Sequence, residues 1–117
     1  MIIIGRERVL SNNCTQHMYV QFLDELKHRY KNAKNGHTYD FNTEIQPFLM
    51  HSKMIAECID DCDLDTRFTY KIKDKVMSTI TELAMSAHIE RFSNKLFTEM
   101  HKYISHWFFY LIERDSK

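Results

Sequence analysis

Residues 40–62 read DFNTEIQPFLMHSKMIAECIDDC, and apolar or small residues recur along them at alternating spacings of four and three. These positions are Phe41, Ile45, Phe48, Ser52, Ile55, Ile59 and Cys62. This spacing places them on one stripe of an α-helix. Asp40 is a good N-cap, and Pro47 lacks a backbone N–H, which predicts a bend or a separate first two turns. The stretch therefore predicts a long helix with one core-facing stripe.

Three further segments, residues 10–34, 69–88 and 93–114, repeat this helical period. Asn35-Gly36 ends the first, Thr69 is a candidate cap for the third, and Ser93 precedes the fourth. Their stripes are Tyr19, Phe22, Leu23, Leu26 and Tyr30; Ile72, Val76, Ile80, Leu83 and Ala87; and Leu96, Met100, Tyr103, Trp107 and Tyr110. Four segments of similar length joined by short links predict an all-α, up-down-up-down four-helix bundle.

The length and composition of the chain agree with a single helical domain. Its 117 residues include two glycines and one proline, which argues against a fold built on many tight turns. Residues 1–9 lie outside the helical pattern. We expect them to form a loosely ordered N-terminal extension, with residues 10–117 forming the bundle.

Charge and cysteine content restrict the partners and the compartment. Sixteen basic and sixteen acidic residues give a net charge of zero, so we expect neither a nucleic-acid nor a membrane partner. No apolar run reaches the length of a signal peptide or a membrane span. Cys14, Cys58 and Cys62 are too few for a disulfide framework and are expected to be reduced thiols. The predicted location is cytoplasmic.

Three patterns resemble parts of metal sites, and none is complete. Glu25 and His28 have the spacing of a di-iron ligand pair but lack a second copy. Cys58 and Cys62 supply half of a tetrahedral zinc site and are interpreted as buried hydrophobic residues. The acidic run 60–65 lacks the glycine and glutamate of a calcium loop, so we expect local charge pairing with the lysines of 71–75, the alternative being a weak cation site. We predict no catalytic residue, no metal and no cofactor.

The fourth segment carries more apolar surface than a bundle requires. Its second stripe consists of Phe97, Ile104, Phe108 and Leu111, and residues 107–112 are apolar around the whole turn. Two interpretations stay open. The segment is either a core helix covered on several sides, or it exposes an aromatic face to a homodimer or another protein partner.

One resemblance extends over most of the chain from about Ser11. The run from Arg29-Tyr30 through Asn35-Gly36-His37-Thr38-Tyr39-Asp40-Phe41 to Glu44-Ile45-Gln46-Pro47, followed by His88-Ile89 and Arg91-Phe92, resembles the YppE-like family of small bacterial proteins of unknown function. The resemblance implies a four-helix bundle and brings no activity, cofactor or catalytic residue. Residues 1–9 extend beyond the usual start of the family, and the acidic run 60–65 departs from its pattern.

In an up-down bundle the first and third links lie at the same end, so the two family-like segments should be neighbours. The candidate interaction surface comprises Tyr39, Asp40, Phe41, Arg91, Phe92, Phe97, Phe108 and Phe109. Alternatively, Asp40 only caps the second helix while Phe41 and Ile45 enter the core. The leading functional hypothesis is a non-enzymatic interaction module with an unidentified protein partner or a second copy. The competing hypothesis is a small-ligand or metal-binding bundle, with the aromatic end of the fourth helix walling a pocket.

Overall fold

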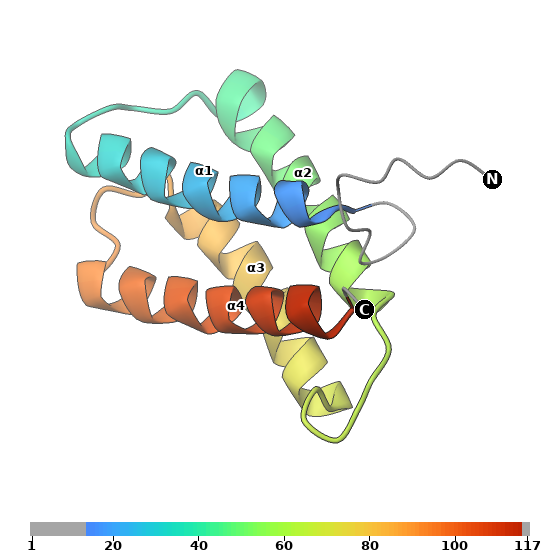
Figure 1. Cartoon of the computed structure of the whole chain (residues 1–117). Helices are drawn as coiled ribbons and strands as arrows, with labels where there is room; N and C mark the ends of the chain where they lie inside the picture. Colours follow the sequence, from blue (N-terminus) through green and yellow to red (C-terminus); the bar gives the residue numbers. More distant parts are fainter. Residues whose placement is uncertain (1–13, 116–117) are drawn as a thin grey trace.

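The computed structural model describes residues 14–115 and confirms the all-α four-helix bundle (Figure 1). The elements are α1 (Gln16–Lys34), the π-helical turn η1 (Phe41–Ile45), α2 (Gln46–Asp60), α3 (Tyr70–Ser86) and α4 (Asn94–Arg114), and the described residues include no strand. None of these helices is long and apolar enough to span a membrane. The expected extension over residues 1–9, and residues 10–13 of the first predicted helix, lie outside the described residues.

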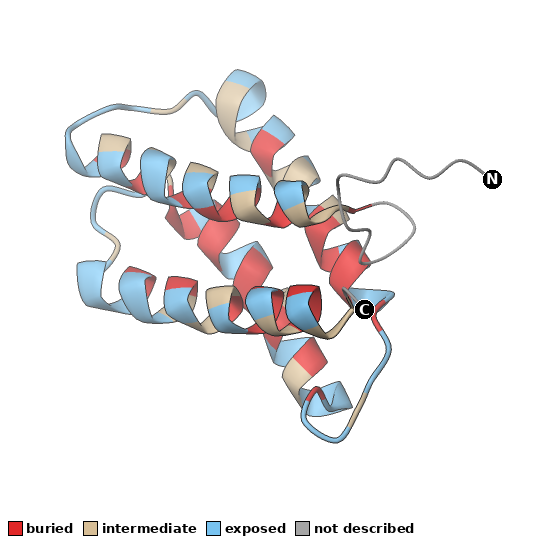
Figure 2. Cartoon of the chain, in the orientation of Figure 1, coloured by how far each residue is buried: buried red, intermediate tan, exposed pale blue. Residues whose placement is uncertain are grey.

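The four helices form two antiparallel pairs. Figure 1 shows α1 beside α4 in one layer and α2 beside α3 in the other, with the two layers crossing at an angle. α2 packs most extensively against α3, and α3 packs next against α4. Figure 2 shows that the buried residues of every helix face the space between the pairs. The core therefore lies between the two layers.

The predicted helix boundaries are capped by side chains. Asp40, Thr69 and Ser93 each accept a hydrogen bond from a backbone N–H in the first turn of the following helix, and Thr15 does the same for α1. Such a bond satisfies one of the N–H groups that a helix start leaves unpaired. After α1, Gly36 adopts a φ of +98°, a conformation that favours glycine and ends the helix at the predicted position.

The start of the second predicted helix is a separate turn, one of the two outcomes predicted from Pro47. Pro47 lies in the first turn of α2, and the five residues before α2, Phe41–Ile45, form the separate π-helical turn. In that turn the N–H groups of Ile45 and Gln46 donate to carbonyls five residues earlier. The wider turn rotates its side chains off the stripe. Phe41 is consequently 49 % exposed and Ile45 half-buried, so the expectation that both enter the core was wrong.

The second stripe of α4 belongs to the core. Phe97, Ile104, Phe108 and Leu111 are all buried, whereas Leu96, which begins the first stripe, is 44 % exposed. This confirms the interpretation of α4 as a core helix covered on several sides. The other interpretation, an aromatic face exposed to a homodimer or another protein partner, does not apply to these four side chains, because α1 covers them from one side: the Tyr19 and Phe108 ring centroids are 4.9 Å apart. Phe109 is 49 % exposed, and a partner contact through α4 stays a prediction.

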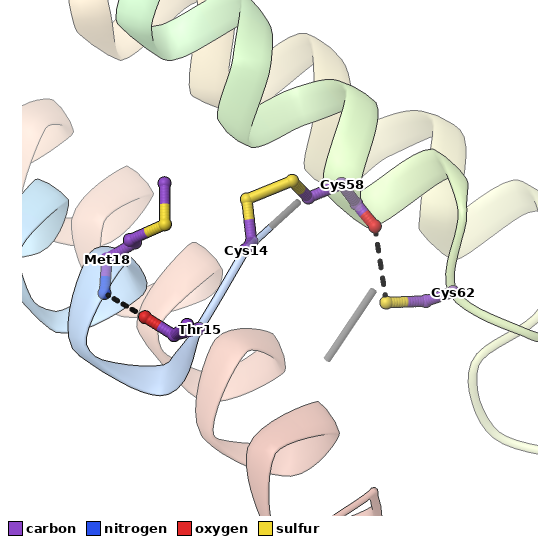
Figure 3. The surroundings of a disulfide bond; sticks show 5 residues. All are labelled: Cys14, Thr15, Met18, Cys58 and Cys62. Carbon is purple, nitrogen blue, oxygen red and sulfur yellow. Dashed lines mark hydrogen bonds between the residues drawn. A yellow bond between two sulfur atoms is a disulfide. The ribbon is translucent and has the colours of Figure 1, made fainter. Parts of the chain in front are cut away.

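A disulfide bond joins Cys14, just before α1, to Cys58 in α2 (Figure 3). The expectation that all three cysteines are reduced was wrong for this pair, because the fold brings their Cα atoms to 6.1 Å. Cys62 is free and buried, and its thiol donates to the Cys58 carbonyl at 3.4 Å. Burial raises the pKa of Cys62 to about 11, which keeps it protonated and unreactive. Since Cys58 is in the disulfide, the two residues do not form half of a zinc site.

The link between α2 and α3 is organised by Asp65. Its carboxylate accepts hydrogen bonds from the backbone N–H of Phe68, from the Tyr110 hydroxyl at 2.8 Å and from Arg114 at 3.0 Å. These bonds, the Phe68 bond first, hold the pKa of Asp65 well below its usual range. Charge pairing in the acidic run therefore involves Arg114 of α4. No group of three or more potential metal ligands occurs among residues 14–115.

Candidate functional site

A groove of about 680 Å³ runs between the C-terminal half of α1 and the N-terminal half of α4. Its floor consists of Tyr30, Phe97 and His101, which are all buried. The Tyr30 and Phe97 rings stack with centroids 4.1 Å apart and planes inclined by 14°. The floor is therefore a rigid aromatic surface contributed by both helices.

His101 adds an uncharged ring to this floor. Its Nε2 atom lies 2.9 Å from the backbone carbonyl oxygen of Leu23, so Nε2 carries the proton and donates it. Burial of the ring lowers the pKa of His101 below its ordinary value. With Nε2 engaged, His101 holds α4 against α1, and this nitrogen is not free to act as a base toward a ligand.

Four lysine side chains surround the floor. Lys27, Lys31 and Lys34 lie on one face of α1, and Lys102 faces them from α4. All four are exposed, and none forms an ion pair with a carboxylate in the part of the chain that the structure describes. The Lys34 ammonium lies 5.2 Å from the centroid of the Tyr30 ring. The rim consequently presents four positive charges that lack a protein counter-charge.

The groove combines an aromatic floor with polar and cationic groups at its rim. The remaining lining residues, Asn35, Asn94 and Thr98, offer amide and hydroxyl groups, and no carboxylate or thiol lines it. Buried aromatic rings below a cationic rim suit an anionic ligand that also carries apolar surface.

Next to the groove, Arg29 ties three elements together. Its guanidinium donates to the Glu25 carboxylate at 2.9 Å, to the backbone carbonyl of Glu44 in η1 at 3.2 Å, and to Nε2 of His88 at 2.8 Å. The same group lies 4.4 Å from the centroid of the Phe48 ring. Arg29 thus fixes the π-helical turn and the residues after α3 against α1.

The contact between Arg29 and His88 requires a neutral histidine. A guanidinium can only donate, so Nε2 of His88 accepts and its proton is on Nδ1. Burial, followed by the charge of Arg29, lowers the pKa of His88. Protonation of His88 would place two donors and two positive charges face to face.

We expect the free energy of unfolding to fall as the pH is lowered from 7.5 to 5.5. His51, His88 and His101 all have a pKa below the ordinary 6.5 in the folded chain, mainly because they are buried. The unfolded chain then binds more protons, so the loss begins as the pH falls through about 6.5 and continues down to the folded pKa values. Urea unfolding at several pH values measures it.

The control for this titration is His88→Gln, whose amide oxygen can still accept from Arg29 and does not titrate. The urea midpoint of this variant should fall less between pH 7.5 and 5.5 than that of the unchanged protein. Equal slopes for the two proteins would contradict the role given to His88.

The eight residues of the predicted interaction surface lie at two different ends of the bundle. Tyr39 and Phe92 are half-buried and lie at the same end of the bundle, as the topology predicted: the Tyr39 ring is 4.8 Å from His88, and the Tyr30 hydroxyl donates to the Phe92 carbonyl. Asp40, Phe41, Arg91 and Phe109 are exposed, whereas Phe97 and Phe108 are buried. Phe109 lies near the far end of α4, so the eight residues do not form one continuous surface.

Sequence reasoning did not single out the lysines that line the groove. Basic residues near the end of a helix are favourable for its dipole, so lysines at the end of the first helix do not by themselves indicate a site. Lys27, Lys31 and Lys34 are four and three residues apart, so their charges repel one another and destabilise the helix. Such a cluster indicates a role other than folding. Lys102 had no sequence signal, because only the pairing of α1 with α4 brings it to the same rim.

Fold and site together define a four-helix bundle with a cationic, aromatic-floored groove between its first and fourth helices. Comparisons with protein-family models, with curated proteins and with solved structures found no match. The resemblance to the YppE-like family stays a prediction.

Proposed function

We propose that this protein is a non-catalytic interaction module that binds an acidic segment of a protein partner in the groove between α1 and α4. The observation that carries the proposal is the set of four unpaired lysines around the buried Tyr30, Phe97 and His101. Carboxylates of the partner would meet the lysines, and an apolar side chain between them would contact the rings. Lysines at a solvent-exposed rim speed association and select for negative charge.

A small anionic ligand is the second candidate. The groove volume of about 680 Å³ lies within the range of small-molecule sites, which favours this alternative. A metal-binding role has no comparable support, because residues 14–115 contain no suitable ligand group. Both candidate ligands would contact the same lysines. A binding experiment therefore distinguishes them by the probe that binds, an acidic peptide or a small anion.

The test uses a fluorescein-labelled peptide of alternating glutamate and phenylalanine residues. Its binding to the protein is measured by fluorescence anisotropy. We expect the double change Lys31→Glu and Lys102→Glu to weaken binding by about tenfold or more, since each reversed charge replaces an attraction of roughly 0.5–1 kcal/mol by a repulsion. Binding to the unchanged protein should also weaken with added salt.

The matched control reverses two exposed lysines outside the groove, Lys53→Glu and Lys71→Glu, which changes the net charge equally. This control should bind the peptide nearly as well as the unchanged protein. Equal losses in both variants, or no peptide binding at all, would refute the proposal. Displacement of the peptide by inorganic pyrophosphate at low concentration would favour the small anionic ligand.

We further propose that the protein acts in the cytoplasm without a cofactor, nucleic acid or membrane. Disulfides are rare in the cytoplasm because thiols there are kept reduced, so this proposal requires the Cys14–Cys58 bond to resist reduction. Cys14 and Cys58 are almost fully buried, which shields their disulfide bond from small reductants while the protein is folded.

A further inference from the structure

A second charged surface lies at the end of α2. We call Glu57, Asp60, Asp61 and Asp63 the acidic patch; all four residues are exposed. Their carboxylates form no ion pair within residues 14–115. Carboxylates in the last turn of a helix are also unfavourable for its dipole. Like the lysine rim, the acidic patch therefore lowers the stability of the isolated chain.

Among the described residues, the cations next to this patch form no ion pair with its carboxylates. Lys73 directs its ammonium to the backbone carbonyl of Asp60 at 2.6 Å. Arg114 is engaged by the carboxylates of Asp65 and Asp115 and by the carbonyl oxygen of Asp63. These bonds leave the patch carboxylates available to an external cation.

The acidic patch and the lysine groove lie at opposite ends of α4. Arg114, the last residue of α4, contacts the link that carries the patch, whereas the groove is lined by residues from Asn94 to Lys102. Figure 1 shows the same separation, with the end of α2 far from the end of α1. Twelve residues of α4, about 18 Å, separate Lys102, the last groove residue, from Arg114, which is about twice the Debye length of about 8 Å at physiological salt. The two surfaces therefore cannot satisfy each other within one molecule.

We propose that the lysine groove of one molecule binds the acidic patch of a second copy. This inference rests on the proposed function and names the partner for the same groove. Four lysines face four carboxylates, and the chain as a whole carries sixteen charges of each sign. With zero net charge, no long-range repulsion opposes the approach of two copies.

The contact joins unlike surfaces, so it is head-to-tail. A pair of molecules retains one free groove and one free patch, and association continues unless the chain of molecules closes into a ring. We therefore expect the mean mass to rise with protein concentration instead of stopping at a dimer.

The test is sedimentation velocity at about 20 mM and about 500 mM salt, which sets a long or a short Debye length. The unchanged protein should associate at low salt and be monomeric at high salt. Two folded variants, Lys31→Glu with Lys102→Glu and Asp60→Lys with Asp61→Lys, should each be monomeric alone. Mixed together, they should associate again, because the unchanged lysine groove of the patch variant can bind the unchanged acidic patch of the groove variant.

Two results would overturn this inference: an unchanged protein that stays monomeric at low salt, or a mixture of the two variants that does not associate. Binding of the glutamate-phenylalanine peptide by a protein that stays monomeric would leave the groove function standing and remove the second copy as its partner. Failure to bind that peptide would count against the groove function itself. The two measurements therefore separate the two failures.

Discussion

Serine in place of Cys58 should lower the free energy of unfolding by about 4 kcal/mol under oxidising conditions. The bond joins residues 44 positions apart. Closing a loop of this length in the unfolded chain removes conformational entropy equivalent to roughly 4 kcal/mol at 25 °C. Urea unfolding of the oxidised protein, the variant and the protein with reductant measures the difference. Under denaturing conditions without reductant, we also expect one titratable thiol in the unchanged protein, that of Cys62.

Cys62→Ser is the matched control for the disulfide prediction. Cys62 lies two residues after the end of α2, close to Cys58, and a serine hydroxyl can still donate to the Cys58 carbonyl. We expect this variant to retain the disulfide and lose much less stability than Cys58→Ser. Identical urea midpoints for the oxidised and the reduced protein would contradict the stabilising role of the Cys14–Cys58 bond.

Changing Phe108 to alanine should cost about 3–5 kcal/mol, the usual loss for a buried phenylalanine. Phe108 is 0 % exposed, and its ring meets that of Tyr19 edge to face in the middle of the core. Phe108→Glu would bury an unpaired carboxylate, so we expect this variant not to fold. Circular dichroism and urea unfolding measure both effects.

The neighbouring Phe109 supplies the control, because it is 49 % exposed on the same helix. Phe109→Ala should change the free energy of unfolding by less than about 1 kcal/mol, as expected for a surface substitution. A folded, monomeric Phe108→Glu protein would place Phe108 on an interface and reverse the assignment of the two aromatic residues.

Helices with a single stripe were predictable from the sequence. Along α3 and its C-cap, Val76, Ile80, Leu83 and Ala87 recur at helical spacing, and all are buried. The caps Asp40, Thr69 and Ser93 were also predictable, since each precedes a periodic segment and offers a side-chain oxygen. Local chemistry determines these features, so a sequence pattern is sufficient to find them.

Features that depend on packing between helices were not predictable. α4 carries two overlapping apolar stripes, and only its contacts with the other helices decide that Phe108 is buried while Leu96 is largely exposed. Three cysteines allow three pairings, and the position of Cys14 beside α2 selects one of them. Lys102 likewise joins the lysines of α1 only through the tertiary pairing of α1 with α4.

The pairing of the first helix with the fourth has a consequence for how the protein matures on the ribosome. α2 and α3 are consecutive, so they can pack together soon after they are synthesised, with little loss of loop entropy. The hydrogen bond from His101 to Leu23 spans 78 residues and must wait for α4. Until then the groove lacks Phe97, His101 and Lys102, and only Tyr30 of its aromatic floor is present. The groove is thus completed last, so the proposed contact with a partner requires the whole chain.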